Sequence, residues 1–230
     1  MNISGIQKKS LLDYPDKIST VLFLQGCNFK CGFCHNPTLN NVSNLEKVLD
    51  NSKILDYLTR SKKITDAVVI TGGEPTLQKD LIKFIKKIKD MNYLIKLDTN
   101  GTNPKILKKI IKNNLVDYAA MDVKGPLEKY KLITDTNSNL KNIKQSIKII
   151  IKSKTPHEFR STILPFWHKR SDVKKMAKLI QGADKYYLQK FISRDQLVSP
   201  TFKTAKSYTK KEMESLAKVA RKIIGHCEVR

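Results

Sequence analysis

Residues 67–75 read Ala-Val-Val-Ile-Thr-Gly-Gly-Glu-Pro, a short apolar run that ends in two glycines. Its β-branched side chains favour a buried strand, because they pack well on a pleated surface. Apolar residues then recur at helical spacing between positions 81 and 88, which predicts an amphipathic helix after the strand. A buried strand followed by an amphipathic helix is the repeating unit of parallel α/β proteins. The stretch therefore predicts an α/β fold with a parallel sheet.

The same alternation of apolar run and amphipathic helix continues along most of the chain. The runs predicted as strands are 20–24, 67–71, 94–98, 117–122, 158–163 and 185–189. About six such units are too few to close an eight-stranded barrel, so we predict an open, partial TIM-type barrel. In such folds the functional residues lie just after the carboxyl ends of the strands.

Polar residues and one glycine predict where helices begin and end. In a capping box, a hydroxyl and a carboxylate satisfy each other's unpaired backbone donors at a helix start. The pairs that match this pattern are Ser43 with Glu46 and Thr209 with Glu212. Gly182 is suited to end a helix that begins near Ser171, and residues 135–139 predict a loop.

The length of 230 residues is enough for one domain with a sizeable core. We predict a single domain with its core at about 18–195 and a C-terminal helix at about 208–224. No run approaches the roughly 18 apolar residues that a membrane helix needs, and residues 1–17 lack the apolar stretch of a signal peptide. These features predict a cytoplasmic protein without a membrane segment, in which the cysteines stay reduced.

The chain carries 44 basic and 21 acidic residues, which gives a formal net charge of +23. Thirty-eight of the basic residues are lysines, and many alternate with apolar residues along predicted helices, as on a solvated helix surface. The sequence has no cluster of arginines and no aromatic stacking motif of the kind that nucleic-acid-binding proteins carry. The charge therefore favours an acidic protein partner, such as an electron carrier, over a nucleic acid.

Three of the four cysteines lie in the segment Cys27-Asn-Phe-Lys-Cys31-Gly-Phe-Cys34, directly after the first predicted strand. Thiolates this close on one loop can share one metal centre. A four-iron cluster offered three thiolates keeps one iron open to an outside molecule. A structural zinc ion is the alternative, with His35 or the distant Cys227 as its fourth ligand, but zinc sites usually have a second cysteine pair, which this sequence lacks. Without such a role, Cys227 is a tail thiol.

Polar residues follow the next three predicted strands as well. Thr71–Pro75 holds paired glycines, which allow close approach of a ligand and leave backbone amide donors accessible. Asp98 opens the segment Asp-Thr-Asn-Gly, and Asp122 and Lys124 follow the strand after that. Each segment alone is also compatible with an ordinary turn. Together they predict one sheet edge with a metal centre, a backbone cradle and carboxylates.

Residues 10–15 (Ser-Leu-Leu-Asp-Tyr-Pro), residues 24–37 with the three cysteines, and the loop at 71–75 resemble the radical S-adenosylmethionine superfamily. Within it, the chain is similar to the activating enzymes of glycyl radical enzymes, especially the longer form of the anaerobic ribonucleotide reductase activating protein. The resemblance extends from about residue 5 to residue 195, with later matches at Phe159-Arg160 and at 187–191.

The resemblance implies roles for individual residues. Cys27, Cys31 and Cys34 would hold three irons of a 4Fe-4S cluster, and S-adenosylmethionine would chelate the fourth iron. The residues implied in binding S-adenosylmethionine are Phe33 at the adenine, Gly72, Gly73 and Glu74 at the methionine amino group, Asp98 and Asp122 as counter-charges, and Lys124 and Arg160 at the carboxylate or ribose. Tyr187 and Gln189 would line the cavity.

The resemblance also implies an oxidoreductase activity. A donor such as ferredoxin or flavodoxin would reduce the cluster, S-adenosylmethionine would be cleaved to methionine and a 5′-deoxyadenosyl radical, and this radical would take a hydrogen from a glycine of a partner enzyme. The alternatives are a pyruvate formate-lyase type of activating enzyme, a radical enzyme that acts on a small molecule or RNA, and a non-enzymatic zinc or cluster module.

Overall fold

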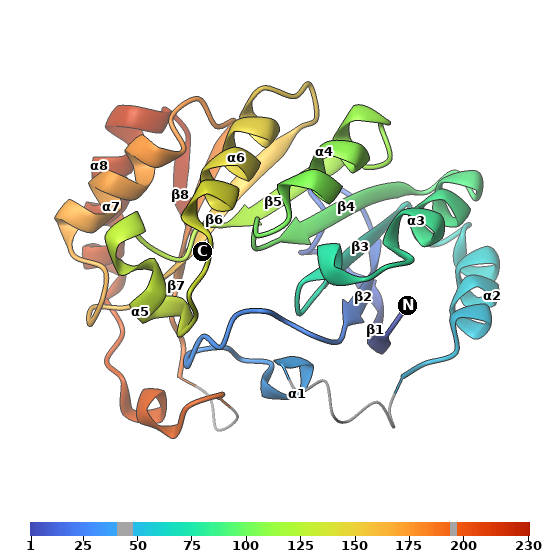
Figure 1. The fold of residues 1–230 in the computed structure, drawn as a ribbon, viewed down its shortest axis with the longest axis horizontal. Coiled ribbons are helices and arrows are strands. Elements are labelled where there is room, and N and C mark those ends of the chain that lie inside the picture. Colours follow the sequence, from blue (N-terminus) through green and yellow to red (C-terminus); the bar gives the residue numbers. More distant parts are fainter. Residues whose placement is uncertain (41–47, 194–196) are drawn as a thin grey trace.

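A computed structural model describes residues 1–40, 48–193 and 197–230 and contains one sheet of eight strands in the order β1 to β8 (Figure 1). All six predicted strands are present, and each boundary lies within one residue of the prediction. They are β2 (Ser19–Leu24), β3 (Ala67–Gly72), β4 (Leu94–Thr99), β5 (Tyr118–Asp122), β6 (His157–Ile163) and β7 (Lys185–Lys190). The prediction of a parallel α/β fold is confirmed.

The strands β2 to β8 run parallel, whereas β1 pairs with β2 in the antiparallel direction. In the described part of the chain, β1 and β8 form the two edges and do not pair with each other. The sheet is therefore an open barrel, as the number of predicted units indicated.

The two edge strands β1 (Ile3–Ser10) and β8 (Cys227–Val229) were not predicted. The strand β1 carries Gln7, Lys8 and Lys9 in exposed positions, so it lacks the apolar run that marks a strand buried on both faces. The strand β8 has only three residues, and Cys227 points into the core with an exposed fraction of 2%. The expected tail thiol is thus part of the sheet.

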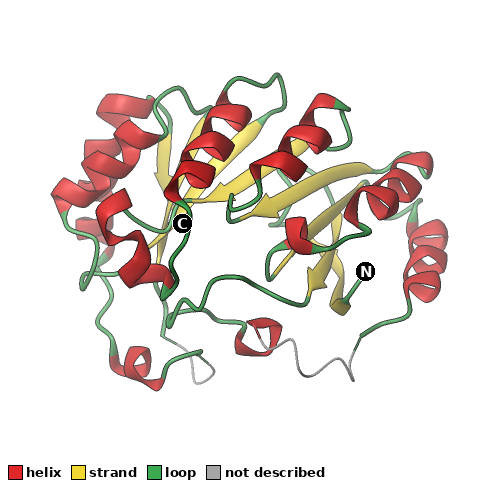
Figure 2. Cartoon of the chain, in the orientation of Figure 1, coloured by secondary structure: helices red, strands yellow, loops and turns green. Residues whose placement is uncertain are grey.

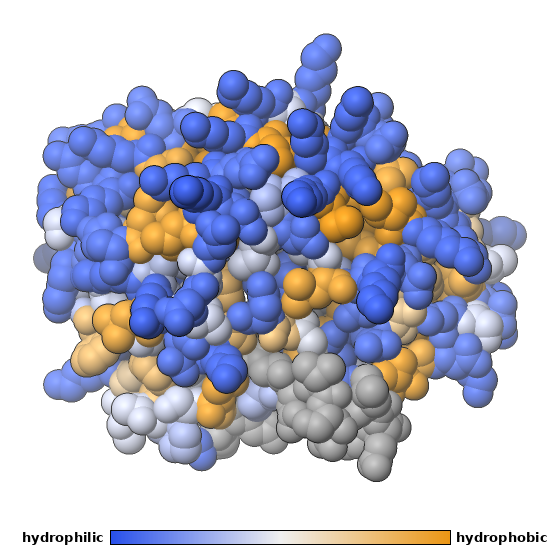
Figure 3. Space-filling view, viewed as in Figure 1, coloured by the Kyte–Doolittle hydropathy of each residue, from blue (hydrophilic) through white to orange (hydrophobic). Residues whose placement is uncertain are grey.

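Helices follow the strands and form an arc around the outer face of the sheet (Figures 1 and 2). The helices are α1 (Pro37–Asn40), α2 (Asn51–Ser61), α3 (Leu81–Asp90), α4 (Pro104–Lys112), α5 (Tyr130–Thr134), α6 (Leu140–Ile151), α7 (Arg170–Leu179) and α8 (Lys210–Ile224). The described residues also form short 3-10 helices at η2 (Pro75–Leu77), η3 (Leu127–Lys129) and η4 (Pro200–Thr204). The apolar stripes of the long helices and the outer faces of the strands make the main core. Hydrophilic side chains cover most of the face in Figure 3, as expected for lysine-rich helices.

The predicted helix boundaries agree with the structure where it describes them. Thr209 and Glu212 form the capping box that begins α8. Gly182, with φ +98°, follows α7, and residues 135–139 connect α5 to α6. Ser43 and Glu46 lie outside the described residues. No helix in the described ranges is long and apolar enough to cross a membrane.

The inner face of the sheet has an apolar floor near the amino ends of the strands. Tyr14 packs there against Val21, Val69 and Tyr118, and the Tyr14 and Tyr118 rings lie 6.0 Å apart. Tyr14 belongs to the segment 11–17 that connects β1 to β2, so this connection closes the bottom of the barrel. Polar residues occupy the inner face above the floor and lead up to the carboxyl ends of the strands.

Candidate functional site

The loops after β2, β3, β4 and β5 and the ends of β6 and β7 surround one cavity of about 270 Å³. Ten of the eleven predicted site residues line this cavity. They are Cys27, Cys31, Phe33, Cys34, Gly72, Gly73, Asp98, Asp122, Lys124 and Arg160. The carboxyl ends of parallel strands meet at one edge of a sheet, and this brings together residues that are far apart in sequence.

The three cysteines lie on the loop between β2 and α1. Hydrogen bonds give this loop its shape, because the Gly26 amide donates to the Leu39 carbonyl at 2.7 Å and the Cys34 amide to the Cys31 carbonyl at 3.0 Å. Burial raises the pKa of the Cys31 thiol to about 12 although Lys124 opposes the rise, and burial also raises the pKa of Cys27. These thiols need a positive metal centre to become thiolates at neutral pH.

The cysteine loop suits an iron–sulfur cluster better than a closed zinc site. All three thiols are free and line the same cavity, and thiolates are the usual ligands of such clusters. The Ile192 carbonyl accepts a hydrogen bond from His35 Nε2 at 2.8 Å, and Cys227 packs in the main core. Of the two proposed fourth zinc ligands, His35 already has a hydrogen-bond partner and Cys227 lies in the main core. Among the described residues, no group of three His, Cys, Asp or Glu side chains is placed to hold a single ion.

The paired glycines follow β3 and pack against the cysteine loop. The Gly73 amide donates to the Leu24 carbonyl and the Glu74 amide to the Gly26 carbonyl, both at 2.8 Å. A Cβ on Gly73 would lie 2.1 Å from the Gly26 carbonyl oxygen. The expectation that this loop offers free amide donors is therefore wrong, because neighbouring backbone already uses them. The glycines are needed for close contact between the two loops.

Glu74 is completely buried and does not line the cavity. Its carboxylate accepts hydrogen bonds from the Thr76 amide at 3.0 Å, the Thr99 hydroxyl at 2.7 Å and the Asn100 amide at 2.6 Å. Burial raises the pKa of this carboxyl, and the hydrogen bonds from Thr76, Asn100 and Thr99 oppose the rise. Glu74 thus connects the loop after β3 to the loop after β4.

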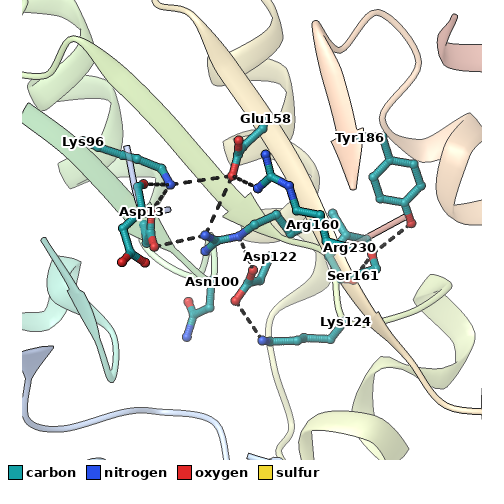
Figure 4. Close-up of polar contacts among 12 residues, drawn as sticks. Asp13, Lys96, Asn100, Asp122, Lys124, Glu158, Arg160, Ser161, Tyr186 and Arg230 are labelled. Carbon is teal, nitrogen blue, oxygen red and sulfur yellow. Dashed lines mark hydrogen bonds and ion pairs between the residues drawn. The ribbon is translucent and has the colours of Figure 1, made fainter. Parts of the chain in front are cut away.

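The predicted charged residues form one ion-pair network at the edge of the cavity (Figure 4). Arg160 Nη1 lies 3.1 Å from Asp98 Oδ2, and Arg160 Nε lies 3.1 Å from Asp122 Oδ1. Asp122 Oδ2 contacts Lys124 Nζ at 3.0 Å. Burial opposes ionisation of Asp122, but Lys124 and Arg160 hold its pKa at about 2. Asp122 is therefore ionised at neutral pH, and the four side chains connect β4, β5 and β6.

Three further charged residues extend this network below the cavity and were not predicted. Lys96 Nζ lies 3.5 Å from Asp98 Oδ1 and 3.6 Å from Glu158 Oε1. Arg230 Nη1 also approaches Glu158 Oε1, at 3.6 Å. The sequence contained a signal for Lys96 and Glu158. Each stands two residues before a predicted site residue and therefore lies on the same face of the strand.

Asn100 is a cavity residue that sequence reasoning missed. Its side chain donates to Asn28 Oδ1 at 2.9 Å, and Asn28 donates to the Thr102 hydroxyl at 2.9 Å. These bonds connect the cysteine loop to the loop after β4. The segment Asp98–Gly101 had been identified, but only its aspartate was selected.

Aromatic side chains surround Phe33, which lines the cavity with an exposed fraction of 5%. Its ring lies 5.5 Å from the Trp167 ring and 6.4 Å from the Phe202 ring. Gln189 also lines the cavity, whereas Tyr187 lies outside the lining and packs under the Arg230 guanidinium at 3.3 Å. The cavity thus combines thiols, paired glycines, paired charges and aromatic side chains.

The chain matches the family model of the radical SAM superfamily over residues 21–180. A protein of Methanocaldococcus jannaschii, provisionally named a glycyl-radical enzyme activating enzyme, is 36% identical over 99% of this chain and 95% of its own length. The pyruvate formate-lyase-activating enzyme of Clostridium pasteurianum is 29% identical over 78% of this chain and 76% of its own length.

Among solved structures, SuiB of Streptococcus suis bound to S-adenosylmethionine aligns with a TM-score of 0.67. The alignment covers 89% of this chain but only 48% of the SuiB chain, at 15% sequence identity. At that identity the similarity establishes the fold alone, which is a partial barrel in both proteins.

Replacing Glu158 with glutamine is expected to lower the free energy of unfolding by about 3 kcal/mol, because three cations would lose a fully buried counter-charge. Urea unfolding measures this change. Glu128→Gln is the matched control, since Glu128 pairs with Lys175 on the exposed surface and its loss should have a much smaller effect. Equal effects of the two substitutions would contradict the importance of the internal network.

Gly73→Ala is expected to lower the free energy of unfolding by about 2 kcal/mol, because its Cβ would collide with the Gly26 carbonyl. Gly5→Ala is the control, since its nearest contact would be an ordinary 3.5 Å to Phe23, and a change within about 0.5 kcal/mol is expected there. Thermal and urea unfolding of both variants provide the comparison. A Gly73→Ala protein as stable as the original would show that the two loops are not in close contact.

Proposed function

This chain belongs to the radical S-adenosylmethionine superfamily, and we propose that it is an activating enzyme that installs a glycyl radical on a partner enzyme. Members of this superfamily use a 4Fe-4S cluster and S-adenosylmethionine as cofactors. The observation that carries the proposal is that three thiols, a carbonyl-bearing loop and a charge network line one cavity.

Cys27, Cys31 and Cys34 would hold the cluster, and their three thiols leave one iron for the amino and carboxylate groups of S-adenosylmethionine. When bound, the cluster supplies one electron to the sulfonium, which yields methionine and a 5′-deoxyadenosyl radical. The protein contributes binding, orientation and electrostatics to this chemistry.

The cavity residues suit the separate parts of S-adenosylmethionine. The Gly73 amide is already paired, so the loop at Gly72 and Gly73 would bind the ammonium group through carbonyl oxygens, which accept hydrogen bonds. Lys124 and Arg160 would contact the carboxylate or the ribose. We assign Phe33 to the adenine, as the resemblance implies; it is one of two phenylalanines, with Phe29, that the cysteine loop places on the cavity lining.

Asp98 and Asp122 would act mainly by holding Arg160 and Lys124 in place, with their negative charge also balancing the sulfonium. Glu74 would act from outside the cavity, as a positioning residue that keeps the loops after β3 and β4 together. This role replaces the direct contact with the methionine amino group that the resemblance implied for Glu74.

The relatives named as activating enzymes support a glycyl radical enzyme as the partner. The sequence resemblance favours anaerobic ribonucleotide reductase, and the Clostridium relative makes a pyruvate formate-lyase type of partner the second candidate. An open barrel suits either partner, because a loop that carries the glycine must enter the cavity from outside.

We further propose that a low-potential carrier such as ferredoxin or flavodoxin supplies the electron. The net charge of +23 would attract such an acidic protein and raise its association rate. The chain is then an oxidoreductase of the cytoplasm, where thiols stay reduced.

Oxygen-free reconstitution with iron and sulfide is expected to give a brown protein with about four irons per chain, because three thiols suit a cubane cluster. Cys31→Ala should lose most of this iron. Cys227→Ala is the matched control, and it should retain the iron because Cys227 lies in the core behind the sheet. A colourless protein, or iron loss in both variants to the same extent, would contradict the assignment.

The reduced protein mixed with S-adenosylmethionine and a glycyl radical enzyme is expected to produce a glycyl doublet in the electron paramagnetic resonance spectrum of that enzyme. Anaerobic ribonucleotide reductase and a pyruvate formate-lyase type of enzyme are tested in parallel, and the one that acquires the doublet is the partner. If S-adenosylmethionine is cleaved but neither enzyme acquires a radical, the activating function is wrong and a small molecule or RNA substrate is favoured.

A further inference from the structure

We propose that a groove on the outer side of the cysteine loop is the docking site for an acidic protein that carries one electron, and this inference rests on the proposed function. The groove has a volume of about 470 Å³ and lies between the cysteine loop, α5, Trp167 and η4. We call it the Trp167 groove. Lys30 and Gly32 of the cysteine loop form one of its walls.

The cysteine loop separates the Trp167 groove from the cavity by a single layer of chain. Cys31 and Phe33 line the cavity, whereas Lys30 and Gly32 line the groove. The far side of the loop is held by the segment that begins at Leu197, because the Ser199 amide donates to the Gly32 carbonyl at 2.9 Å. A protein in the groove therefore comes close to the three thiols without entering the cavity.

Packed aromatic rings connect the surface beside the groove to the cysteine loop. Phe166 is 76% exposed, and its ring lies 5.8 Å from the Trp167 ring. The Trp167 ring lies 5.5 Å from Phe33, which stands between Cys31 and Cys34 in the sequence. Electron transfer is faster through packed atoms than across gaps, so this contact chain favours entry at Phe166.

The surface around the groove has the chemistry of a small interface for an acidic protein. Leu132 is 63% exposed and lies on α5 at the edge of the groove, where Figure 3 shows apolar side chains among hydrophilic ones. Lys30, Lys131 and Lys203 are exposed around it. Among the described residues, Asp135 is the acidic residue that lines the groove. Apolar anchors within a rim of lysines are suited to a transient contact with a negatively charged partner.

An electron carrier fits this groove better than the glycyl radical enzyme does. The enzyme that receives the radical must place its glycine inside the cavity, and the groove faces the other side of the cysteine loop. In the proposed step the carrier is oxidised by one electron and the group held by the three cysteines is reduced by one electron. No bond is formed or broken, and no proton is transferred.

The first test is binding, which needs no turnover. Titration calorimetry measures the affinity of flavodoxin for the full chain. We expect the double variant Lys131→Glu, Lys203→Glu to weaken binding about tenfold, because two attractive charges become repulsive. The control is Lys83→Glu, Lys87→Glu, which makes the same change of net charge on exposed lysines of α3 and should have a much smaller effect. Equal weakening by both double variants would overturn the proposal.

The second test is the rate of reduction of the reconstituted protein in a stopped-flow spectrometer. Phe166→Ala is expected to slow reduction by flavodoxin about tenfold and to leave reduction by dithionite unchanged, because the small reductant needs no docking surface. Slower reduction by both agents would indicate a general structural change and would overturn the proposal.

The glycyl radical partner provides the third outcome. If Phe166→Ala and the Lys131, Lys203 variant impair radical transfer to that partner with dithionite as reductant, while flavodoxin binding is unchanged, the groove binds the partner enzyme and the proposal is wrong. Failure of the proposed function would differ from all these results. In that case the original protein, with dithionite as reductant, would place no glycyl radical on either candidate partner enzyme.

Discussion

Hydrogen bonds between the loops that follow β2, β3 and β4 determine the positions of the residues that line the cavity. The Gly73 and Glu74 amides hold the loop after β3 against the loop after β2, and the Glu74 carboxylate holds it against the loop after β4. Glu74 is fully buried, so separating the loops would leave its polar atoms without partners, at a cost of about 1 to 3 kcal/mol per group. The three loops therefore move only together, and the position of the thiols depends on residues that touch no ligand.

The fold was predictable where burial on both faces of a strand produced an apolar run. All six interior strands were found on that basis, because each is followed by a helix that covers it. The strand β1 could not be found in this way, since three of its eight residues are exposed to solvent at the edge of the sheet. The strand β8 depends on the position of α8 against β7, and such a tertiary contact leaves no periodic pattern in three residues.

The location of the site was also predictable, because parallel strands bring their carboxyl ends to one edge. The directions in which the side chains and backbone amides point could not be predicted. Glu74 follows a glycine pair like a ligand-binding residue, yet its carboxylate turns into the protein toward Thr99 and Asn100. Lys96 and Glu158 were missed because a charge inside a strand is unfavourable unless opposite charges from other strands surround it. Those partners become visible only when β4, β5 and β6 are placed side by side.

The connection between β1 and β2 closes the end of the barrel at the amino ends of the strands. Tyr14 packs beside Tyr118 at this end. The neighbouring Asp13 carbonyl accepts a hydrogen bond from Lys96 Nζ at 2.6 Å, which connects the segment to the internal charge network. In the described part of the chain, a radical formed above this floor would lie at the carboxyl ends of the strands, where the cavity is. A target that approached from that side would share its path with S-adenosylmethionine, so the order in which the two arrive would affect the reaction.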